Sequence, residues 1–566
     1  MRFSFLLLLF GSRLASCVDR DPRVLTILDK HAGSISKAVH LITRVIHDGL
    51  HVFIPPFEAK QAGSNIPARE STLIDASLSM VHAVRSALQL DFPSKVSRVD
   101  VVLQALIPII ADAGELIIGE RERRRLVLAE TSRLVSDLNL DLRNLVSAFA
   151  EPISGHVNFA LFEVMVQATG WPHCNLVDTL IFGFHPIGVV PSTGCLRPVC
   201  EEAVAVPSKE SNLQSFADAV EHLSRKARKA NGNVEAKADC VAVWDATMAE
   251  VDKGFCVGPL SMGQVQKLFS DSSHGPRCIP AFGVWQKGKL RRIDDAAESG
   301  HNELTQMLET IVCAQADLPA ELAIEFYKVL PPGVRLRLGT DDIASAYRVL
   351  ASAEPEYNVA AVWCPGGVDA SADPGVQYFA LRGFNFGLKS APVHLATLMR
   401  PMMEFARKVM LVACEQFYDD VVVVDPVFGR VSAQRNLDFM FRLLGFPFAP
   451  RKHERLREAN AFLGVVTDFS SMALGYVLLR IKEKRRRNLI SELRDVLRSG
   501  KLSPGHAARL RGKLYFSTTS AFGGVGRPAL QAFATRQYSK SKNHSLDDSL
   551  RGSIQFFIRL LADLPS

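Results

Sequence analysis

The sequence predicts an α+β fold behind a mainly helical N-terminal region, and three observations support this. Apolar residues recur at three- and four-residue spacing between positions 101 and 138, as expected of helices that bury one face. The β-branched run Val421–Val424 and the apolar run Leu411–Ala413 predict two buried strands, joined at an acidic hairpin turn. Ser503 and Pro504 supply an N-cap and a first helical position for a later helix.

The composition is that of an ordinary globular protein. The chain has 566 residues, 48% of them hydrophobic and 22% charged, with a net charge of +7. This length predicts roughly two to four domains, and the composition excludes a disordered chain or a multispan membrane protein. The modest positive charge is compatible with nucleic-acid binding. Ten cysteines without a CxxC pair suit a reducing compartment.

The first 17 residues have the shape of a short secretory signal. Arg2 is followed by an apolar run and then by small residues up to Cys17, a stretch too short to span a bilayer. We expect a chance apolar start on an intracellular protein (cytoplasm or nucleus) without a membrane span, with secretory entry as the alternative.

Five segments follow from the pattern along the chain. After the signal-like segment 1–17, residues 18–150 predict a helical region of unknown role and residues 151–235 a mixed connecting region. Residues 236–475 alternate between helical and strand patterns, with a helix over 241–251 and a strand pair over 281–293. Residues 476–566 predict helices, including one over 488–499 that Gly500 ends. The basic run 480–487 before it is interpreted either as a solvated helix start or as a phosphate contact.

The chemistry concentrates on Phe417-Tyr418-Asp419-Asp420. Two adjacent carboxylates at a hairpin turn are costly to bury unless a cation holds them. A tight acidic turn at a sheet edge is a natural seat for a divalent metal. Upstream, Leu336–Tyr347 places Asp342 at the end of another predicted strand and an aromatic residue five positions later.

Four blocks in a fixed order resemble the reverse transcriptase family. They are D-x-x-S-A-Y at Asp342–Tyr347, F-G-L-x-x-A-P at Phe386–Pro392, the block ending in Asp419-Asp420, and F-L-G at Phe462–Gly464. The match is closest to retrotransposon enzymes of the long-terminal-repeat and tyrosine-recombinase types, and it covers roughly residues 236–560. It implies a right-hand polymerase fold, with fingers, a palm built on an antiparallel sheet, and a thumb.

The resemblance also implies catalytic roles for individual residues. Asp342 and Asp419 would bind two Mg²⁺ ions, with Mn²⁺ as an alternative, and Asp420 would support the site. Lys452 is the candidate proton donor to pyrophosphate, with its neighbours Arg451 and His453 as alternatives. Asp341, the neighbour of Asp342, is expected to be a solvated residue without a role.

Nucleotide contacts are implied in the same way. Tyr347 would leave no room for a 2′-hydroxyl, Phe386 would contact the sugar, and Gly387 would let the backbone approach the base and template. In the strand pair 281–293, Lys287, Lys289 and Arg291 would hold the triphosphate. Ala296-Ala297 departs from the residues common in the family just after this hairpin.

The sequence thus predicts an RNA-directed DNA polymerase that adds dNTPs to a primer 3′-hydroxyl on an RNA or DNA template. No later carboxylate set suggests a ribonuclease H domain, so a piece or a domesticated copy of a retrotransposon is expected. The alternatives are a catalytically silent nucleic-acid-binding relative, an RNA-dependent RNA polymerase, which Tyr347 disfavours, and a secreted helical protein with a spurious C-terminal match.

Overall fold

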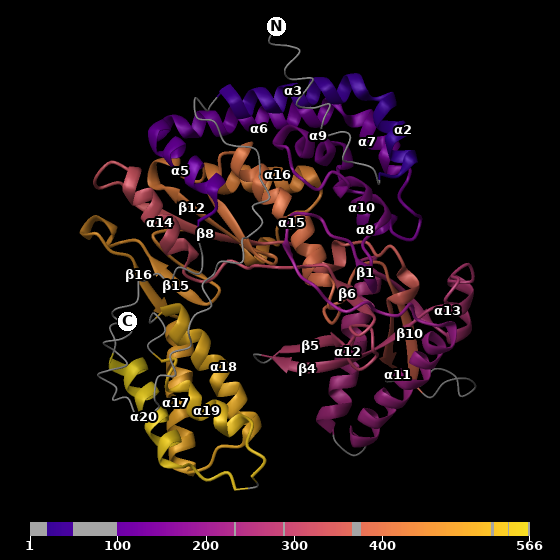
Figure 1. Cartoon of the computed structure of the whole chain (residues 1–566), viewed down its shortest axis with the longest axis vertical. Helices are drawn as coiled ribbons and strands as arrows, with labels where there is room; N and C mark the ends of the chain where they lie inside the picture. Colours follow the sequence, from indigo (N-terminus) through magenta and orange to yellow (C-terminus); the bar gives the residue numbers. More distant parts are fainter. Residues whose placement is uncertain are drawn as a thin grey trace.

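The computed structural model describes residues 20–48, 99–230, 234–286, 289–364, 375–521, 526–541 and 543–563. The signal-like segment 1–17 and Lys287 therefore lie outside the described residues. Helices and several sheets occur together, so the expected mixed α/β fold is confirmed. In Figure 1 the N-terminal helices lie at the top with one sheet directly below them, and toward the other end the C-terminal helices lie on the left and a second sheet with its helices on the right.

A four-stranded antiparallel sheet forms the centre of the molecule. Its order is β11-β12-β8-β13, with β8 at Leu336–Asp342, β11 at Cys414–Phe417, β12 at Asp420–Pro426 and β13 at Glu454–Arg457. Successive side chains of a strand point to opposite faces, so the four valines of β12 divide between two cores. Val421 and Val423 pack with α15 (Ala391–Lys408) and α16 (Ser432–Leu444). Val422 and Val424 pack with α14 (Leu318–Val329) and α5 (Val101–Ala113).

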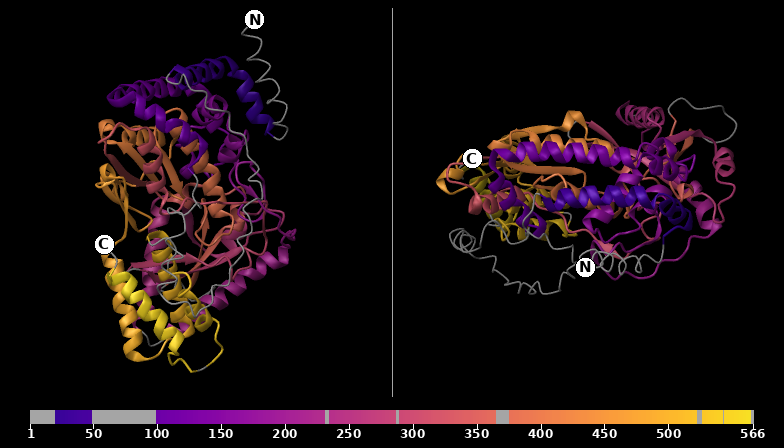
Figure 2. Two further views of the ribbon diagram at one scale, coloured as in Figure 1. Left: turned by 60° about the vertical axis from the view of Figure 1, so that its left-hand side comes forward. Right: turned by 90° about the horizontal axis from the view of Figure 1, so that it is seen from above.

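The N-terminal helices share the first of these cores. Residues of α3 (Ala32–Asp48), α7 (Ser136–Arg143) and α9 (Phe159–Thr169) lie in one hydrophobic cluster with α15, α16 and β12. Figure 2 shows α3 and α6 (Ile117–Leu134) crossing over the top of the central sheet region. The region expected to be an accessory of unknown role is therefore packed directly onto the sheet that carries the acidic turn.

Two arginines of α6 are fully buried in this packing. Arg121 donates to both carboxylate oxygens of Asp425, at 2.8 and 2.7 Å, and to the carbonyl of Leu411. Arg124 donates to the carbonyls of Lys408 and Val409 at the end of α15. The charged cluster 120–125, which only interrupts an apolar face in the sequence pattern, therefore ties α6 to the central sheet and its covering helix.

One described stretch, Val101–Leu134, is long and apolar enough to cross a membrane by length and composition. It comprises α5, a short 3-10 turn and α6. Leu103, Leu106 and Ile110 of α5 pack against Leu322 and Phe326 of α14. The expectation that the chain has no membrane span stays a prediction.

A second sheet has the order β3-β10-β9-β4-β5. Its strands are β3 (Cys256–Leu260), β4 (Cys278–Gln286), β5 (Lys289–Asp294), β9 (Val359–Trp363) and β10 (Val376–Leu381). Helices α11 (Lys209–Ala230) and α12 (Val234–Asp252) pack beside it. The predicted helix 241–251 and strand pair 281–293 thus occur within α12 and β4–β5. In Figure 1 the β4–β5 hairpin projects from this sheet toward the side where α18 lies.

The C-terminal helices have a hydrophobic core of their own. They are α17 (Glu483–Ser499), α18 (Pro504–Ala521), α19 (Leu530–Gln537) and α20 (Asp548–Asp563), and they follow the sheet β14-β15-β16 (Ala459–Phe462, Val465–Asp468, Leu478–Ile481). The cap Ser503 and the terminating Gly500, at a φ of 66°, are confirmed. The helix predicted over 488–499 begins earlier, at Glu483. Charged residues with long straight side chains are good helix formers, so most of the basic run is itself helical.

The remaining helices and strands connect these layers. They are α2 (Pro22–Lys30), α8 (Glu151–Ser154), α10 (Leu176–Phe182), α13 (Met262–Leu268), β1 (Gly188–Val190), β2 (Arg197–Pro198), β6 (Thr305–Met307) and β7 (Glu309–Thr310). The short pairs β1–β6 and β2–β7 join the connecting region to the segment before α14.

Candidate active site

The acids predicted to bind metal lie together at one end of the central sheet. Strands β8 and β12 pair with Asp342 opposite Asp420. Tyr418 and Asp419 form the two-residue turn between β11 and β12, with Tyr418 at a φ of 55°. The amide of Ile343 donates to the carbonyl of Asp419 at 3.1 Å, which fixes the turn over the end of β8. Acids 77 positions apart in the sequence are thereby brought to one sheet end by strand register.

Burial and mutual repulsion raise the pKa values of the acids at this turn. Burial, followed by the charge of Asp342, raises the pKa of Asp419. Burial raises the pKa of Asp420 to about 7, and the charges of Asp419 and Asp342 add to the effect. Three carboxylates in this arrangement cannot all be ionised at low cost unless a cation joins them.

Lys452 supplies one such cation. It belongs to the short 3-10 turn Pro450–Lys452, and its Nζ lies 2.5 Å from Oδ2 of Asp342. The other oxygen, Oδ1 of Asp342, is buried, and no N–H or hydroxyl of the described residues donates to it, although the Asp342 carboxylate shares a side-chain hydrogen bond with the protonated form of Asp420. A buried carboxylate oxygen needs a donor or a cation. The site therefore fits a divalent ion, since hard cations such as Mg²⁺ prefer carboxylate oxygens.

The described residues contain no ready-made cage of three or more His, Cys, Asp and Glu side chains for a metal ion. Mg²⁺ in nucleotide-handling sites is usually held by one or two carboxylates together with substrate phosphates. The arrangement of Asp342 beside Asp419 and Asp420 fits an ion that the nucleotide completes.

Tyr347 and Phe386 form an aromatic corner beside the acids. Their ring centroids are 5.2 Å apart and their planes nearly perpendicular. Burial raises the pKa of the Tyr347 hydroxyl to about 12, and the nearby charge of Asp419 is the next cause, which places the ring next to the acidic turn. Phe386 is 57% exposed, unlike most rings of the molecule. An exposed ring against a half-buried one leaves a surface on which a sugar can rest.

Gly387 is required by a close approach within the protein. A Cβ at this position would lie 1.9 Å from the carbonyl oxygen of Asp294 at the end of β5. Asn385 shapes the same turn, because its Oδ1 accepts from the amides of Gly387 and Leu388 at 3.0 and 3.2 Å. The absence of a side chain at Gly387 therefore allows close contact with the end of the β4–β5 hairpin. Contact between Gly387 and a base or template stays a prediction.

The triphosphate contacts predicted on the β4–β5 hairpin are only partly described. Lys287 lies outside the described residues, and Lys289 begins β5. Arg291 is exposed on β5 opposite Val284. Its guanidinium faces solvent rather than the core, which leaves it available to an anion.

The next residue, Arg292, joins a buried ion network that the sequence analysis missed. Arg292 pairs with Asp294 at 2.7 Å and with Glu250 of α12 at 3.1 Å. Arg348, one position after Tyr347, pairs with Glu250 at 3.0 Å and donates to the carbonyl of Phe384. The sequence did contain a sign of this network. Neighbouring strand residues face opposite sides, so if Arg291 faces solvent, Arg292 must face the protein and needs a buried acidic partner.

Asp341 is not the solvated residue that was expected. Its side chain is 3% exposed, and its oxygens lie 3.0 Å from Nε2 of Gln434 and 2.6 Å from Nδ1 of His453. Asp341 and Asp342 are consecutive strand residues, so they face opposite sides of β8. A sequence pattern cannot tell which side of a strand will be covered, and α16 covers this one with Gln434.

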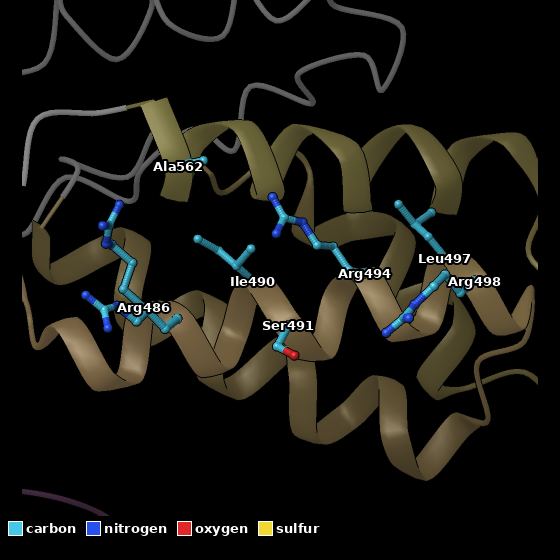
Figure 3. Close-up of a pocket in the computed structure, with 8 residues that line it drawn as sticks. Arg486, Ile490, Ser491, Arg494, Leu497, Arg498 and Ala562 are labelled. Carbon is cyan, nitrogen blue, oxygen red and sulfur yellow. The ribbon is translucent and has the colours of Figure 1, made fainter.

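The basic run is partly neutralised within the protein. Glu483 binds both Arg486 and Arg487, and Asp468 binds Arg480. Further along α17, a surface groove of about 860 Å³ lies between α17 and α20. Its arginines are Arg486, Arg487, Arg494 and Arg498, and Figure 3 shows Arg494 reaching from α17 toward α20. Arg498 is paired with Asp495, so Arg494 is the groove arginine without an ion pair among the described residues and can meet a polyanion.

No family model matches the sequence, and no curated protein matches it. Among solved structures, one that resembles the chain is a foamy viral protease-reverse transcriptase in complex with double-stranded DNA. It is 11% identical with a TM-score of 0.37, and the match covers 74% of this chain and 60% of the viral chain. This likeness is too weak to indicate a fold or a function. The function is therefore inferred from the geometry of the acidic site.

Proposed function

We propose that this protein is a nucleotidyltransferase, an RNA-directed DNA polymerase that extends a primer with dNTPs. The observation that carries the proposal is the meeting of Asp342 with Asp419 and Asp420 across paired strands, where a buried Asp342 oxygen receives no N–H or hydroxyl donor from the described residues. In this proposal the central sheet is the palm, the β3-β10-β9-β4-β5 sheet belongs to the fingers, and α17–α20 form the thumb.

Asp342 and Asp419 would hold the divalent ions, Mg²⁺ or Mn²⁺. When bound, such ions lower the pKa of the primer 3′-hydroxyl and neutralise charge on the leaving pyrophosphate. The residues of the chain itself do the positioning. Asp420 lies in the same pairing and adds negative charge that favours the cations. Lys452 provides an ammonium at Asp342 and is the proposed proton donor to pyrophosphate.

Tyr347 and Phe386 would select the sugar. The Tyr347 ring would fill the space where a ribose 2′-hydroxyl would lie, and Phe386 would contact the sugar itself. Arg291 on the exposed face of β5, with Lys287 and Lys289, would meet the triphosphate. The substrate expected from these residues is a deoxynucleoside triphosphate. Because the reaction needs nucleotides and a template, we place it inside the cell.

The decisive experiment is primer extension. Purified protein is incubated with a primed RNA template, Mg²⁺ and either dNTPs or NTPs. We expect extension with dNTPs, and we expect Asp419→Asn to reduce its rate by about 10³-fold or more, because a transition-state interaction is removed. The control is Glu130→Gln on α6, which removes a carboxylate from an exposed pair with Arg133. Extension that survives in Asp419→Asn would contradict the metal site, and extension with NTPs alone would contradict the role of Tyr347.

A second candidate is a catalytically silent nucleic-acid-binding protein. The arginine groove between α17 and α20 favours it, because phosphate binding there needs no active site. This candidate predicts salt-sensitive binding of a primed template without extension under any divalent metal. The same preparation distinguishes the two functions.

A further inference from the structure

Asp341 and Asp342, at the end of β8, each pair with a basic residue of the turn that precedes β13. Asp342 faces the acidic site and meets Lys452, while Asp341 faces α16 and meets His453. The two contacts are 2.5 and 2.6 Å long. The turn that carries the ammonium is therefore fastened to β8 on both sides of the strand.

Gln434 of α16 completes the fastening on the buried side. Its Nε2 donates to Asp341 at 3.0 Å and to the carbonyl of Glu454 at 3.0 Å, and its Oε1 accepts from the amide of Leu456 at 3.0 Å. The carboxamide of Gln434 thus links Asp341 of β8 to the carbonyl of Glu454 and the amide of Leu456 at the start of β13, which follows directly after His453. A buried amide in such a network fixes one register of the strand pair.

Gly339 on β8 makes room for this amide. A Cβ at position 339 would lie 2.5 Å from Nε2 of Gln434. The backbone holds the other end of the turn, since the amide of Ala449 donates to the carbonyl of Asp342 at 2.8 Å and the amide of Lys452 donates to the carbonyl of Ala449 at 3.0 Å. The position of the Lys452 backbone is thus determined from both ends.

We propose that Asp341 is a positioning residue, which through His453 and Gln434 holds the turn 449–453 so that the Lys452 ammonium lies where the leaving pyrophosphate emerges. The inference rests on the proposed function. In that reaction the primer 3′-hydroxyl releases its proton to solvent, its oxygen forms a bond to the α-phosphorus, and the bond from that phosphorus to the bridging oxygen breaks. The electron pair leaves with pyrophosphate. The Lys452 ammonium stabilises the charge that develops there and gives it a proton, which the amine regains from solvent.

The kinetic test uses the full chain and weakens only the exposed end of the network. His453→Ala removes the contact to Asp341, His453→Asn offers an amide N–H near the place of Nδ1, and Glu454→Gln changes an exposed neighbour as the control. Single-nucleotide incorporation is measured with dNTPs whose β,γ-bridge is CH₂ or CF₂, so that the leaving groups differ in basicity.

We expect His453→Ala to slow incorporation by about 10-fold with the CH₂ analogue and by clearly less with the CF₂ analogue, while nucleotide affinity changes by less than about twofold. His453→Asn should recover most of the rate. A merely structural defect slows both analogues equally, so an equal loss would overturn the inference while the proposed function stands.

A second measurement does not depend on activity. The lysines of the full chain are acetylated without nucleotide, and the rate at Lys452 is followed by mass spectrometry with exposed Lys482 as the reference. A lysine whose Nζ is held against a carboxylate oxygen, as Lys452 is against Asp342 at 2.5 Å, is less free to attack the reagent and reacts slowly. We expect Lys452 to react several-fold faster in His453→Ala than in the wild type, with Lys482 unchanged. Equal acetylation of Lys452 in the two proteins would overturn the positioning role of Asp341, whether or not the protein incorporates nucleotides. A protein that incorporates no nucleotide would instead count against the proposed function.

Discussion

At the scale of single residues, Tyr347 is the group that would decide between DNA and RNA synthesis. The ring packs edge-on against Phe386 beside the acidic turn, so its bulk is fixed rather than free to swing away. Replacing it with a smaller side chain opens the space that a 2′-hydroxyl needs. A smaller side chain at position 347 should therefore change which nucleotide is accepted and leave the rate of the chemical step with dNTPs unchanged.

We therefore predict that Tyr347→Val lowers the preference for dNTPs over NTPs by about 10- to 100-fold, the range that one shape contact commonly provides. The measurement is the ratio of kcat/KM for matched dNTP and NTP in primer extension. Tyr327→Val, which removes an exposed tyrosine on α14, is the control. An unchanged ratio in Tyr347→Val would show that another group excludes the 2′-hydroxyl.

Asp420 is the residue whose titration should be visible in the stability of the protein. Its pKa rises from the usual 3.8 to about 7 in the folded protein, chiefly through burial and then through Asp419 and Asp342. The folded state therefore binds this proton more tightly than the unfolded state does. The resulting stabilisation is complete below about pH 4 and is lost as the pH rises toward the folded pKa.

As the pH is raised from 4 to about 7, we expect the Tm of the wild type to fall relative to the Tm of Asp420→Asn. Mg²⁺ favours the ionised acids, so it should raise the wild-type Tm more at pH 8 than at pH 5. Thermal denaturation across this range, with and without Mg²⁺, provides both numbers. A pH-independent difference between the two proteins would mean that Asp420 is ionised without penalty.

At the scale of elements, α6 is held to the central sheet by a buried ion pair. The side chains of Arg121 and Asp425 are both 0% exposed, and Asp425 lies on β12, the strand that begins with Asp420. Breaking such a pair leaves an uncompensated buried charge, which is much more costly than losing an exposed pair. The charged cluster of α6 is thus a structural feature of the sheet.

Arg121→Met should lower the free energy of unfolding by about 3–5 kcal/mol, because Asp425 loses its cation. The double change Arg121→Met with Asp425→Leu should recover a large part of this loss. Arg123→Met, which affects a partly exposed pair with Glu120, should cost no more than about 1 kcal/mol. Urea denaturation of the four proteins measures these values, and a single variant as stable as the wild type would show that the pair adds nothing.

At the scale of the whole molecule, the hydrophobic cores divide the chain unevenly. The N-terminal helices share one core with α15, α16 and β12, whereas α17–α20 bury their apolar residues in a separate cluster. Removing one side of a shared core exposes a large apolar surface, but removing a unit with its own core does not. The two ends of the chain should therefore differ in how far they can be removed.

We predict that a chain beginning at residue 151 aggregates or binds a hydrophobic dye, while a chain ending at residue 482 stays folded. Size-exclusion chromatography and circular dichroism of the two proteins are sufficient measurements. A soluble, cooperatively unfolding chain 151–566 would show that the N-terminal helices contribute little to the shared core.

The local features of this protein can be predicted from its amino-acid sequence, because they depend on neighbouring residues. The buried strand at Val421–Val424, the cap at Ser503 and the end at Gly500 follow from side-chain pattern and backbone preference, and the structure confirms these features. These three signals extend over a few residues, which is why a sequence displays them. The strand predicted at Leu411–Ala413 is wrong, because β11 begins only at Cys414. The grouping of Asp342, Tyr347 and the Asp419-Asp420 turn into one site spans 77 positions and was expected only from the resemblance of the ordered blocks.

Which charges are buried could not be predicted from the sequence and depends on the packing of distant elements. Arg121 and Asp341 look like solvated surface residues in the sequence, but their partners Asp425 and Gln434 lie about 300 and 90 positions away. Gly387 likewise meets the distant carbonyl of Asp294. Whether a charge is solvated or paired depends on which elements pack together, and that information resides in the whole set of buried contacts rather than in the local pattern around any one residue.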